Sequence, residues 1–466
     1  MLSPEKTARL SLLLGSLPAQ VAARLARAVE IDRLSGGTGL PHDLILGTLR
    51  PMLRQVERMP TPLRLFCRPF EDLVVAEAPK EKQKGRIART SIAPVWRWLS
   101  ETLLPEASAA FASDIKALVL AGRFDDARAR ASAFWSLAAH AMQNALAHDR
   151  KAARTALANE AVLADADEIA LLLGAGSEMS EVQKLVPRPA LQLTDEMLRA
   201  LRDVHDRLIA SAPDAAPYVA VVAMNRLMHP WQALKLPQLV AHHSDDTLIS
   251  ATDMGLVGDL LFSDIERHGG AIRAARHPDF DAEAIVEHLS HFAELSGSIV
   301  KEIDIRRDGK WGKRLLKDRA AVAETMGSLM ERAPKEIVAM LPVQKSGAFG
   351  GGPKCADFTR AVDDEKAERG LRYARLVVGC APYAALGSFA AAQKDAYEEA
   401  SQHLRGYNED VVRELRAAAA DDARRRAVVE RQFDLATALT GLLFSPEEAE
   451  FLRRRGKAAT SAQVAA

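Results

Sequence analysis

Residues 391–443 read AAQKDAYEEASQHLRGYNEDVVRELRAAAADDARRRAVVERQFDLATALTGLL. This stretch contains no proline and only two glycines, and its larger apolar residues are spaced mostly four or seven positions apart: Tyr397, Leu404, Val411, Leu415, Val428 and Leu435. That spacing places them on one face of a helix. The register drifts, and Glu414 falls where a strict heptad needs an apolar residue. We therefore expect a hairpin of two long helices within the chain, in preference to a long dimeric coiled coil.

The rest of the chain has the same helical character. Alanine-rich windows with apolar residues three and four positions apart recur throughout, and alternation with a period of two is almost absent. A chain of 466 residues is longer than one hydrophobic core usually organises. The sequence predicts an all-α fold of multi-helical bundles in two to three packing units, with the long-helix hairpin at the C-terminus.

Two stretches of low apolar content suggest where the units end. Residues 78–90 carry five basic residues against one acid, and residues 344–353 contain four glycines. The expected order is a helical unit over 1–77, a basic linker over 78–90, a central multi-helical unit over 91–343, a glycine-rich linker over 344–359, a long-helix unit over 360–456 and a disordered tail over 457–466. A split of the central unit near 187–193 is an alternative.

Composition narrows the class of protein. Lys and Arg together number 62, as do Asp and Glu, so the formal charge is zero and any attraction to a polyanion must be local. Apolar residues make up 48% of the chain, which is typical of a soluble globular protein. The three cysteines, Cys67, Cys355 and Cys380, are too few and too scattered for a disulfide framework. We expect a cytoplasmic protein with no membrane anchor.

Basic segments with tryptophan are the strongest local signal. Residues 80–98, KEKQKGRIARTSIAPVWRW, form the first basic window, and residues 306–319, RRDGKWGKRLLKDR, form the second. Cations can neutralise phosphates while an indole stacks on a base, and an acidic protein could use the same surface. The candidate contacts are Lys80, Lys82, Lys84, Arg86, Arg89, Arg306, Arg307, Lys310, Trp311, Lys313 and Arg314. The alternative is an exposed basic linker followed by a core helix in which Trp96 and Trp98 are buried, with a helix turn at Asp308 and Gly309 in the second window.

Three sequence patterns could indicate catalysis or ligand binding, but each also fits a structural role. Glu287, His291 and Glu294 share one helix face that points away from the apolar face, so solvent exposure explains them better than a metal site. The glycine-rich residues 347–354 lack the Ser or Thr of a phosphate-binding loop. Cys67 lies beside arginines but among large apolar residues, which favours a packed thiol. No catalytic, metal-binding or cofactor-binding residue is assigned, and no cofactor is expected.

Function follows from these patterns only in outline. The leading expectation is a non-enzymatic helical scaffold or adaptor that binds another protein through helical grooves. The alternative is a protein associated with RNA or single-stranded DNA, which would use the two basic windows. An enzyme assembled from residues scattered along the sequence is a third hypothesis, because catalytic groups commonly converge from distant segments. The oligomeric state stays open.

Overall fold

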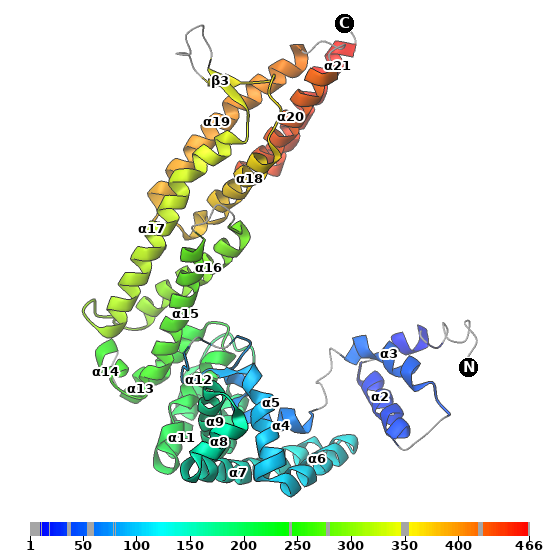
Figure 1. Ribbon diagram of the computed structural model, residues 1–466, viewed down its shortest axis with the longest axis vertical. Helices are drawn as coiled ribbons and strands as arrows, with labels where there is room; N and C mark the ends of the chain where they lie inside the picture. The colour runs from blue at the N-terminus through cyan, green and yellow to red at the C-terminus, as the bar shows by residue number, and fades with distance from the viewer. Residues whose placement is uncertain are drawn as a thin grey trace. The chain divides into compact units, whose positions relative to one another are not determined.

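The computed structural model describes residues 10, 12–17, 19–34, 39–53, 60–77, 79, 81–241, 245–275, 280–345, 354–417 and 423–464. Regular structure in these residues is almost entirely helical, as Figure 1 shows. The predicted all-α, multi-helical fold is confirmed. The chain divides into two compact units, residues 1–236 (unit 1) and residues 237–466 (unit 2).

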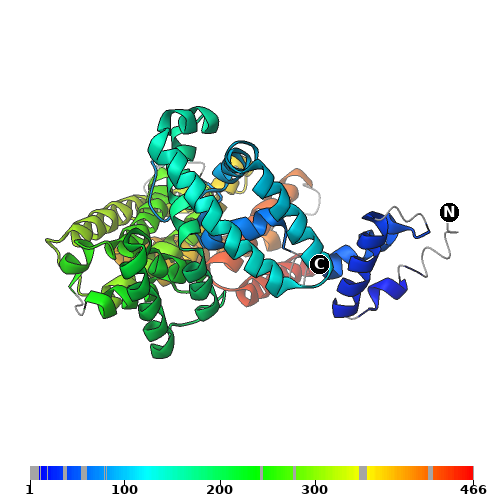
Figure 2. The same ribbon diagram turned by 90° about the horizontal axis from the view of Figure 1, so that it is seen from below.

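Unit 1 begins with a helical hairpin, blue in Figure 2, formed by α2 (Ala19–Leu34) and α3 (His42–Leu53). Its core consists of buried residues from both helices and the segment before them: Leu14, Ala22, Ala26, Val29, Ile45 and Leu49. An imidazole–carboxylate contact joins the two helices: Nε2 of His42 on α3 lies 2.8 Å from Oδ2 of Asp32 on α2.

The remainder of unit 1 is a multi-helical bundle. In chain order it contains α4 (Pro62–Cys67), η1 (Arg68–Leu73), β1 (Val74–Val75), β2 (Ile87–Ala88), α5 (Arg89–Trp98), η2 (Leu99–Leu103), α6 (Pro105–Leu120), α7 (Phe124–His148), α8 (Arg150–Leu157), α9 (Glu160–Gly174), α10 (Gly176–Leu185), α11 (Asp195–Ser211), η3 (Pro213–Ala215), α12 (Tyr218–Arg226) and η4 (Pro230–Leu234). The strands β1 and β2 form a short parallel pair. Aromatic rings fill the centre, where Phe111 and Phe134 stack with their centroids 4.1 Å apart.

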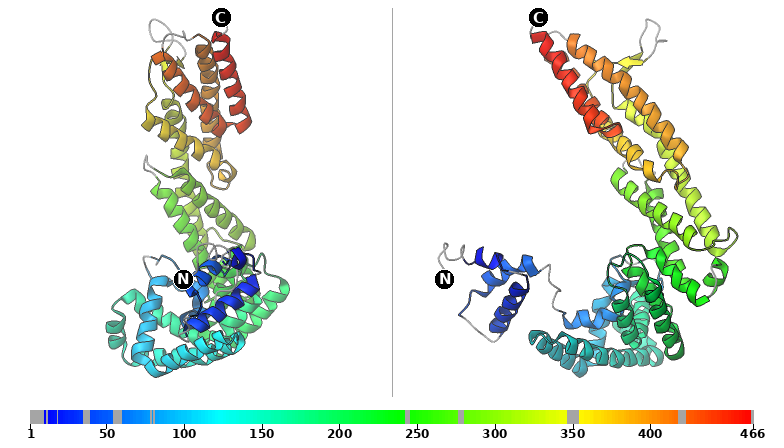
Figure 3. Two further views of the ribbon diagram at one scale, coloured as in Figure 1. Left: turned by 90° about the vertical axis from the view of Figure 1, so that its right-hand side faces the viewer. Right: turned by 180° about the vertical axis from the view of Figure 1, so that it is seen from behind.

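Unit 2 is built on long helices. After α13 (Lys235–Ala241), which spans the limit between the units, it contains α14 (Asp246–Ser250), α15 (Gly255–Ala274), α16 (Ala282–Glu302), α17 (Lys310–Ala339), β3 (Val343–Lys345), β4 (Lys354–Ala356), α18 (Asp364–Gly379), η5 (Ala381–Tyr383), α19 (Ala390–Ala417), α20 (Ala423–Leu443) and α21 (Pro446–Val464). Figure 3 shows α17 to α21 side by side. The expected long-helix hairpin is present as α19 and α20, which pack against each other.

The unit limits differ from the expected ones. The limit at residues 236–237 falls inside the expected central unit 91–343. The reason is α17, a helix of 30 residues that packs against α15 as well as α18 and α19 and so joins the segments on either side of residue 343. Around residues 187–193 the chain stays attached to unit 1, since Ala190 N donates to Arg226 O at 2.9 Å and Met228 N donates to Ala190 O at 2.8 Å.

The segments expected to be linkers or tail also carry order where they are described. Residues 343–345 and 354–356 form the antiparallel pair β3–β4, and the amide of Ala356 donates to Oδ2 of Asp410 at 3.2 Å. The expected phosphate-loop outline, residues 347–354, lies outside the described residues except for Lys354 in β4. The expected tail, 457–466, is helical through Val464 as part of α21. No described helix is long and apolar enough to cross a membrane.

Candidate functional site

The first basic window is anchored to unit 1 over most of its described length. Lys80 lies outside the described residues. Ile87 and Ala88 are buried in β2, and Trp98 is buried at the end of α5. The ring of Trp96 packs on Phe66 with the centroids 4.9 Å apart, and Trp96 is half-buried. The burial of Trp98 agrees with the alternative of a core helix, but the segment before it is held to the bundle and is not an exposed linker.

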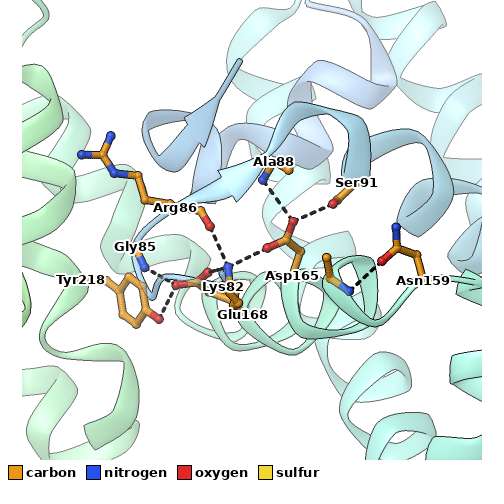
Figure 4. A network of polar contacts seen from close by, with 10 residues as sticks. Lys82, Gly85, Arg86, Ala88, Ser91, Asn159, Asp165, Glu168 and Tyr218 are labelled. Carbon is orange, nitrogen blue, oxygen red and sulfur yellow. Dashed lines mark hydrogen bonds and ion pairs between the residues drawn. The ribbon is translucent and has the colours of Figure 1, made fainter. Parts of the chain in front are cut away.

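Lys82 is the centre of a polar network, drawn in Figure 4. Its Nζ donates to Oδ1 of Asp165 at 2.6 Å, to Oε2 of Glu168 at 2.5 Å and to the carbonyl of Arg86 at 2.7 Å. The two carboxylate side chains are only 4% and 5% exposed. Both lie on α9, three residues apart, so they share one helix face and reach the same ammonium.

The rest of the network satisfies the remaining carboxylate oxygens. Glu168 accepts from the amide of Gly85 and from the hydroxyl of Tyr218, each at 2.6 Å. Asp165 accepts from the amide of Ala88 at 3.1 Å and from the hydroxyl of Ser91 at 2.6 Å. Gly85 adopts a φ of 81°, a left-handed conformation that favours glycine. The network therefore folds this window onto α9, because two buried carboxylates require these donors.

The second basic window lies at the start of α17 in unit 2. Trp311 is fully buried, and its indole Nε1 donates to Oδ1 of Asp259 on α15 at 2.9 Å. The same carboxylate lies 2.8 Å from Nζ of Lys310 and 3.0 Å from Nη1 of Arg314. Arg314 also pairs with Glu266 at 2.8 Å. Two of the candidate cations, Lys310 and Arg314, thus form ion pairs with acids of α15. The indole of Trp311 is buried, so a nucleic-acid base cannot stack on it.

Four candidate cations of the two windows are exposed and form no ion pair with any described residue: Lys84, Arg89, Arg307 and Lys313. Arg306 lies 3.5 Å from Asp308. The amide of Arg306 donates to Asp246, whose carboxylate is buried and has a pKa raised above its usual range by that burial.

Unit 1 contains a second buried ion pair, between Asp72 and Arg226, that the sequence did not predict. Asp72, at the end of η1, accepts from Nη1 of Arg226 at 3.0 and 2.9 Å and from Nε2 of Gln183 at 3.0 Å. Its side chain is 1% exposed. Arg226 lies 154 residues away in the sequence, so no local pattern indicates the pair.

The surroundings of the candidate metal ligands and of the candidate nucleophile Cys67 do not favour metal binding or nucleophilic attack. Glu287, His291 and Glu294 are exposed on α16, as expected for a helix face opposite the apolar one. Among the described residues no group of three or more His, Cys, Asp and Glu side chains is arranged to hold a metal ion. Cys67 is buried, and burial raises the pKa of its thiol to about 12, which opposes formation of the reactive thiolate.

Three histidines of unit 2 meet across α15 and α16. Nδ1 of His268 lies 3.1 Å from Nδ1 of His288, and the rings of His268 and His291 are 5.0 Å apart. Nη2 of Arg267 lies 3.2 Å from Nε2 of His268. Because an arginine can only donate, Nε2 of His268 accepts and its Nδ1 carries the proton that His288 accepts. Burial and the positive charge of Arg267 lower the pKa of His268 to about 4, so the ring is neutral at pH 7.

A groove between α16 and α18 is the candidate site that best fits a partner. Its cavity of about 370 Å³ is lined by Ala282, Glu283, Val286, Glu287, Ser290, Arg375, Gly379 and Tyr383. Small and apolar residues from successive turns of α16 form its floor, and a Cβ on Gly379 would lie 2.8 Å from Val286, so α18 ends in close contact with α16. We call these lining residues the α16/α18 groove.

The rim of the α16/α18 groove is acidic and partly apolar. Nε of Arg375 lies 3.7 Å from Glu283, while Glu287 forms no ion pair with any described residue. Val378 precedes the lining residue Gly379 and Leu386 lies three residues after the lining residue Tyr383, and both side chains are exposed. Leu386 lies against α16, since a Cβ on Gly297 would be 3.6 Å from its Cδ2.

Comparison with known proteins adds no identification: no family model matches the chain, and neither a curated protein nor a solved structure matches it.

Proposed function

We propose that the protein is a non-enzymatic helical scaffold or adaptor that binds another protein, and that the α16/α18 groove is its binding site. The observation that carries the proposal is the open groove in unit 2, with a floor of small and apolar residues and with exposed Val378 and Leu386 close to its lining residues in the sequence. Exposed apolar surface next to a concave site is typical of protein interaction surfaces. Amphipathic helices bind in such grooves through apolar side chains three and four residues apart.

The occupant is a helix with one apolar face flanked by basic residues. Val286 and Tyr383 would contact the apolar face, and Glu287 would pair with a Lys or Arg of the partner. Complementary charge at a rim chiefly speeds association and selects the partner, while burial of apolar area supplies most of the affinity.

Site-specific cross-linking tests this proposal. A photo-activated cross-linking amino acid at Ser290, inside the groove, should capture a defined segment of one partner in native lysate, and mass spectrometry should identify an amphipathic basic helix. The matched control places the same amino acid at Asp395, an exposed residue of α19 outside the groove. Equal capture at both positions, or captured segments without basic and apolar helical spacing, would contradict the proposal.

Charge reversal at the rim of the groove is a second test of the proposal. Binding of the captured segment to the double variant Glu283→Lys, Glu287→Lys should be at least about tenfold weaker, because like charges would face the partner's basic residues. The control is Glu368→Lys, an exposed acid of α18 that does not line the groove. Unchanged affinity in the double variant would remove the acidic rim from the recognition.

Cytoplasmic localisation belongs to the same proposal. It is supported by Cys67, Cys355 and Cys380, all of which are free thiols. A reducing compartment preserves such thiols. The nucleic-acid alternative receives less support, because Trp311 is buried and Lys82, Lys310 and Arg314 are paired within the fold.

A further inference from the structure

A second cavity, in unit 1, has a different chemical character. It has a volume of about 330 Å³ and lies where α4, η1, α7 and α10 meet. Its polar lining consists mainly of cations and hydroxyls: Arg68, Arg128, Lys184, Ser132, Ser177 and Ser180. None of these residues belongs to the basic windows or to the α16/α18 groove, so the cavity is independent of the proposed adaptor function.

The floor of the cavity is rigid. Leu65 and Trp135 form it, and the indole Nε1 of Trp135 donates to the carbonyl of Leu65 at 2.9 Å. Trp135 is buried against the start of α10, where a Cβ on Gly176 would lie 2.7 Å from its ring. An aromatic ring held by a hydrogen bond and a close backbone contact gives the cavity a fixed apolar base.

Positive charge exceeds negative charge around the cavity. Three cations and one carboxylate, Asp125, line it. Asp125 pairs with Arg128 at 2.6 Å, but its side chain is 95% exposed, so water weakens this pair. Arg68 and Lys184 form no ion pair with any described residue, although Glu71 is close enough to Arg68 for their charges to interact. Two cations therefore remain for an anionic ligand.

The hydroxyls add donors beside these cations. Ser132 and Ser177 lie with their Oγ atoms 3.2 Å apart, on α7 and α10 respectively. The Oγ of Ser180 is buried and has no hydrogen-bond partner among the described residues. An unmatched buried hydroxyl is unfavourable, and rotation about its side-chain bond would let it donate to a ligand in the cavity.

We propose that this cavity binds the phosphoryl group of a small phosphate monoester. A dianionic phosphoryl group has three terminal oxygens, which suits two unpaired cations and neighbouring hydroxyl donors. The Trp135 floor would contact the organic part of the ligand. A cavity of about 330 Å³ is at the lower end of small-molecule sites, which selects a compact ligand.

Isothermal titration calorimetry of the full chain with inorganic phosphate, sulfate and phenyl phosphate tests the proposal. Phenyl phosphate should bind most tightly, because its ring contacts the Trp135 floor. Binding of phenyl phosphate should strengthen as the pH rises through about 6, where a phosphate monoester becomes a dianion, while sulfate binding should not. Absence of saturable binding of either phosphate compound would overturn the proposal. Tighter binding of a phosphoserine peptide than of phenyl phosphate would replace the small ligand by a protein one.

Substitutions in the cavity test whether phenyl phosphate binds there. Lys184→Ala should weaken phenyl phosphate binding about tenfold or more, since a hydrogen bond to a charged group is lost. Ser177→Ala should weaken it less. Lys151→Ala, which removes an exposed cation of α8, is the matched control and should bind like the unmodified protein. Hydrogen exchange of α10 verifies that each variant is folded. A folded Lys184→Ala protein with unchanged affinity would show that the site lies elsewhere.

Discussion

In the first basic window, Lys82 donates to two carboxylates that are 4% and 5% exposed, whereas in the second, Lys310 and Arg314 contact acids that are 37% and 41% exposed. The two windows have similar compositions, with clustered cations beside tryptophan. Their cations nevertheless have different structural roles. Lys82 neutralises charge inside the bundle, while the pairs of the second window lie at the surface of α15.

The difference shows that the environment of the partner sets the energy of an ion pair. A buried carboxylate that loses its cation keeps the cost of its desolvation, but an exposed one is solvated by water. In the second window the buried group is the indole of Trp311, and the cations lie around it. Changes to Lys82, Tyr218, Arg314 and Lys310 should separate the two cases, and titration of His268 adds a buried group that has no carboxylate partner of this kind among the described residues; the expected effects run from the largest to the smallest.

Replacing Lys82 should have the largest effect. Lys82→Met should lower the local free energy of unfolding by about 3–5 kcal/mol, because Asp165 and Glu168 lose their shared cation. Hydrogen exchange of the α9 amides measures this change within unit 1. Lys84→Met, at an exposed and unpaired neighbour, is the matched control and should change it by less than about 0.5 kcal/mol. Equal effects of the two variants would abolish the contrast.

Lowering the pH should reduce the stability of α15, because His268 becomes protonated. The pKa of this ring is about 4 in the folded protein and 6.5 in an unfolded chain, so between these values the unfolded chain binds a proton that the folded protein does not. Lowering the pH from 7 to 4 should therefore reduce the local free energy of unfolding, by roughly 2–3 kcal/mol from this group. The groups facing the ring are Arg267, Asp264, His288 and His291.

Hydrogen exchange of the α15 amides between pH 7 and 4, corrected for the intrinsic exchange rate, measures this loss. His268→Gln should make the dependence on pH shallower, because the titrating ring is gone. An unchanged dependence in that variant would assign the acid sensitivity to other groups.

Tyr218→Phe should produce an intermediate effect in the first region. It removes the hydroxyl that donates to Glu168 at 2.6 Å, but the carboxylate keeps Lys82 and the amide of Gly85. We expect a loss of about 1.5 kcal/mol in the stability of α9, measured by hydrogen exchange. A loss as large as that of Lys82→Met would mean that the hydroxyl, and not the cation, stabilises the carboxylate.

Cations of the second window should matter least. Arg314→Ala should cost at most about 1 kcal/mol, and Lys310→Ala less than about 0.5 kcal/mol, because their partners on α15 are solvated. Both losses should shrink in high salt, which screens exposed pairs. Exchange of the amides at the start of α17, at low and high salt, tests this. A loss above 3 kcal/mol for either variant would place these pairs in the buried class.

Local features of the fold were predictable from the sequence. Thr194 and Ser445 begin helices and accept hydrogen bonds from the amides of Met197 and Glu448, each at 3.2 Å, as capping residues do. The two long helices α19 and α20 follow from apolar spacing. These features depend on residues within one or two helical turns of each other.

The candidate sites depend on contacts that no local pattern encodes. Lys82 lies 83 residues from Asp165 and 86 from Glu168, so its sequence neighbours present it as one more cation of a linker. Val286 and Gly379 form the α16/α18 groove only because α18 packs on α16. In the same way, Arg68, Ser132 and Lys184 of the unit 1 cavity come from three separate elements.

The central claim is that the basic windows stabilise the fold, while recognition of a partner belongs to the α16/α18 groove. Fluorescence anisotropy of labelled single-stranded RNA, single-stranded DNA and duplex DNA, each at low and moderate salt, tests it most directly. The account predicts no saturable binding that depends on salt. Binding that weakens steeply with salt, and that is lost when Lys84, Arg89, Arg307 and Lys313 are changed to Glu, would contradict it and make the windows a nucleic-acid site.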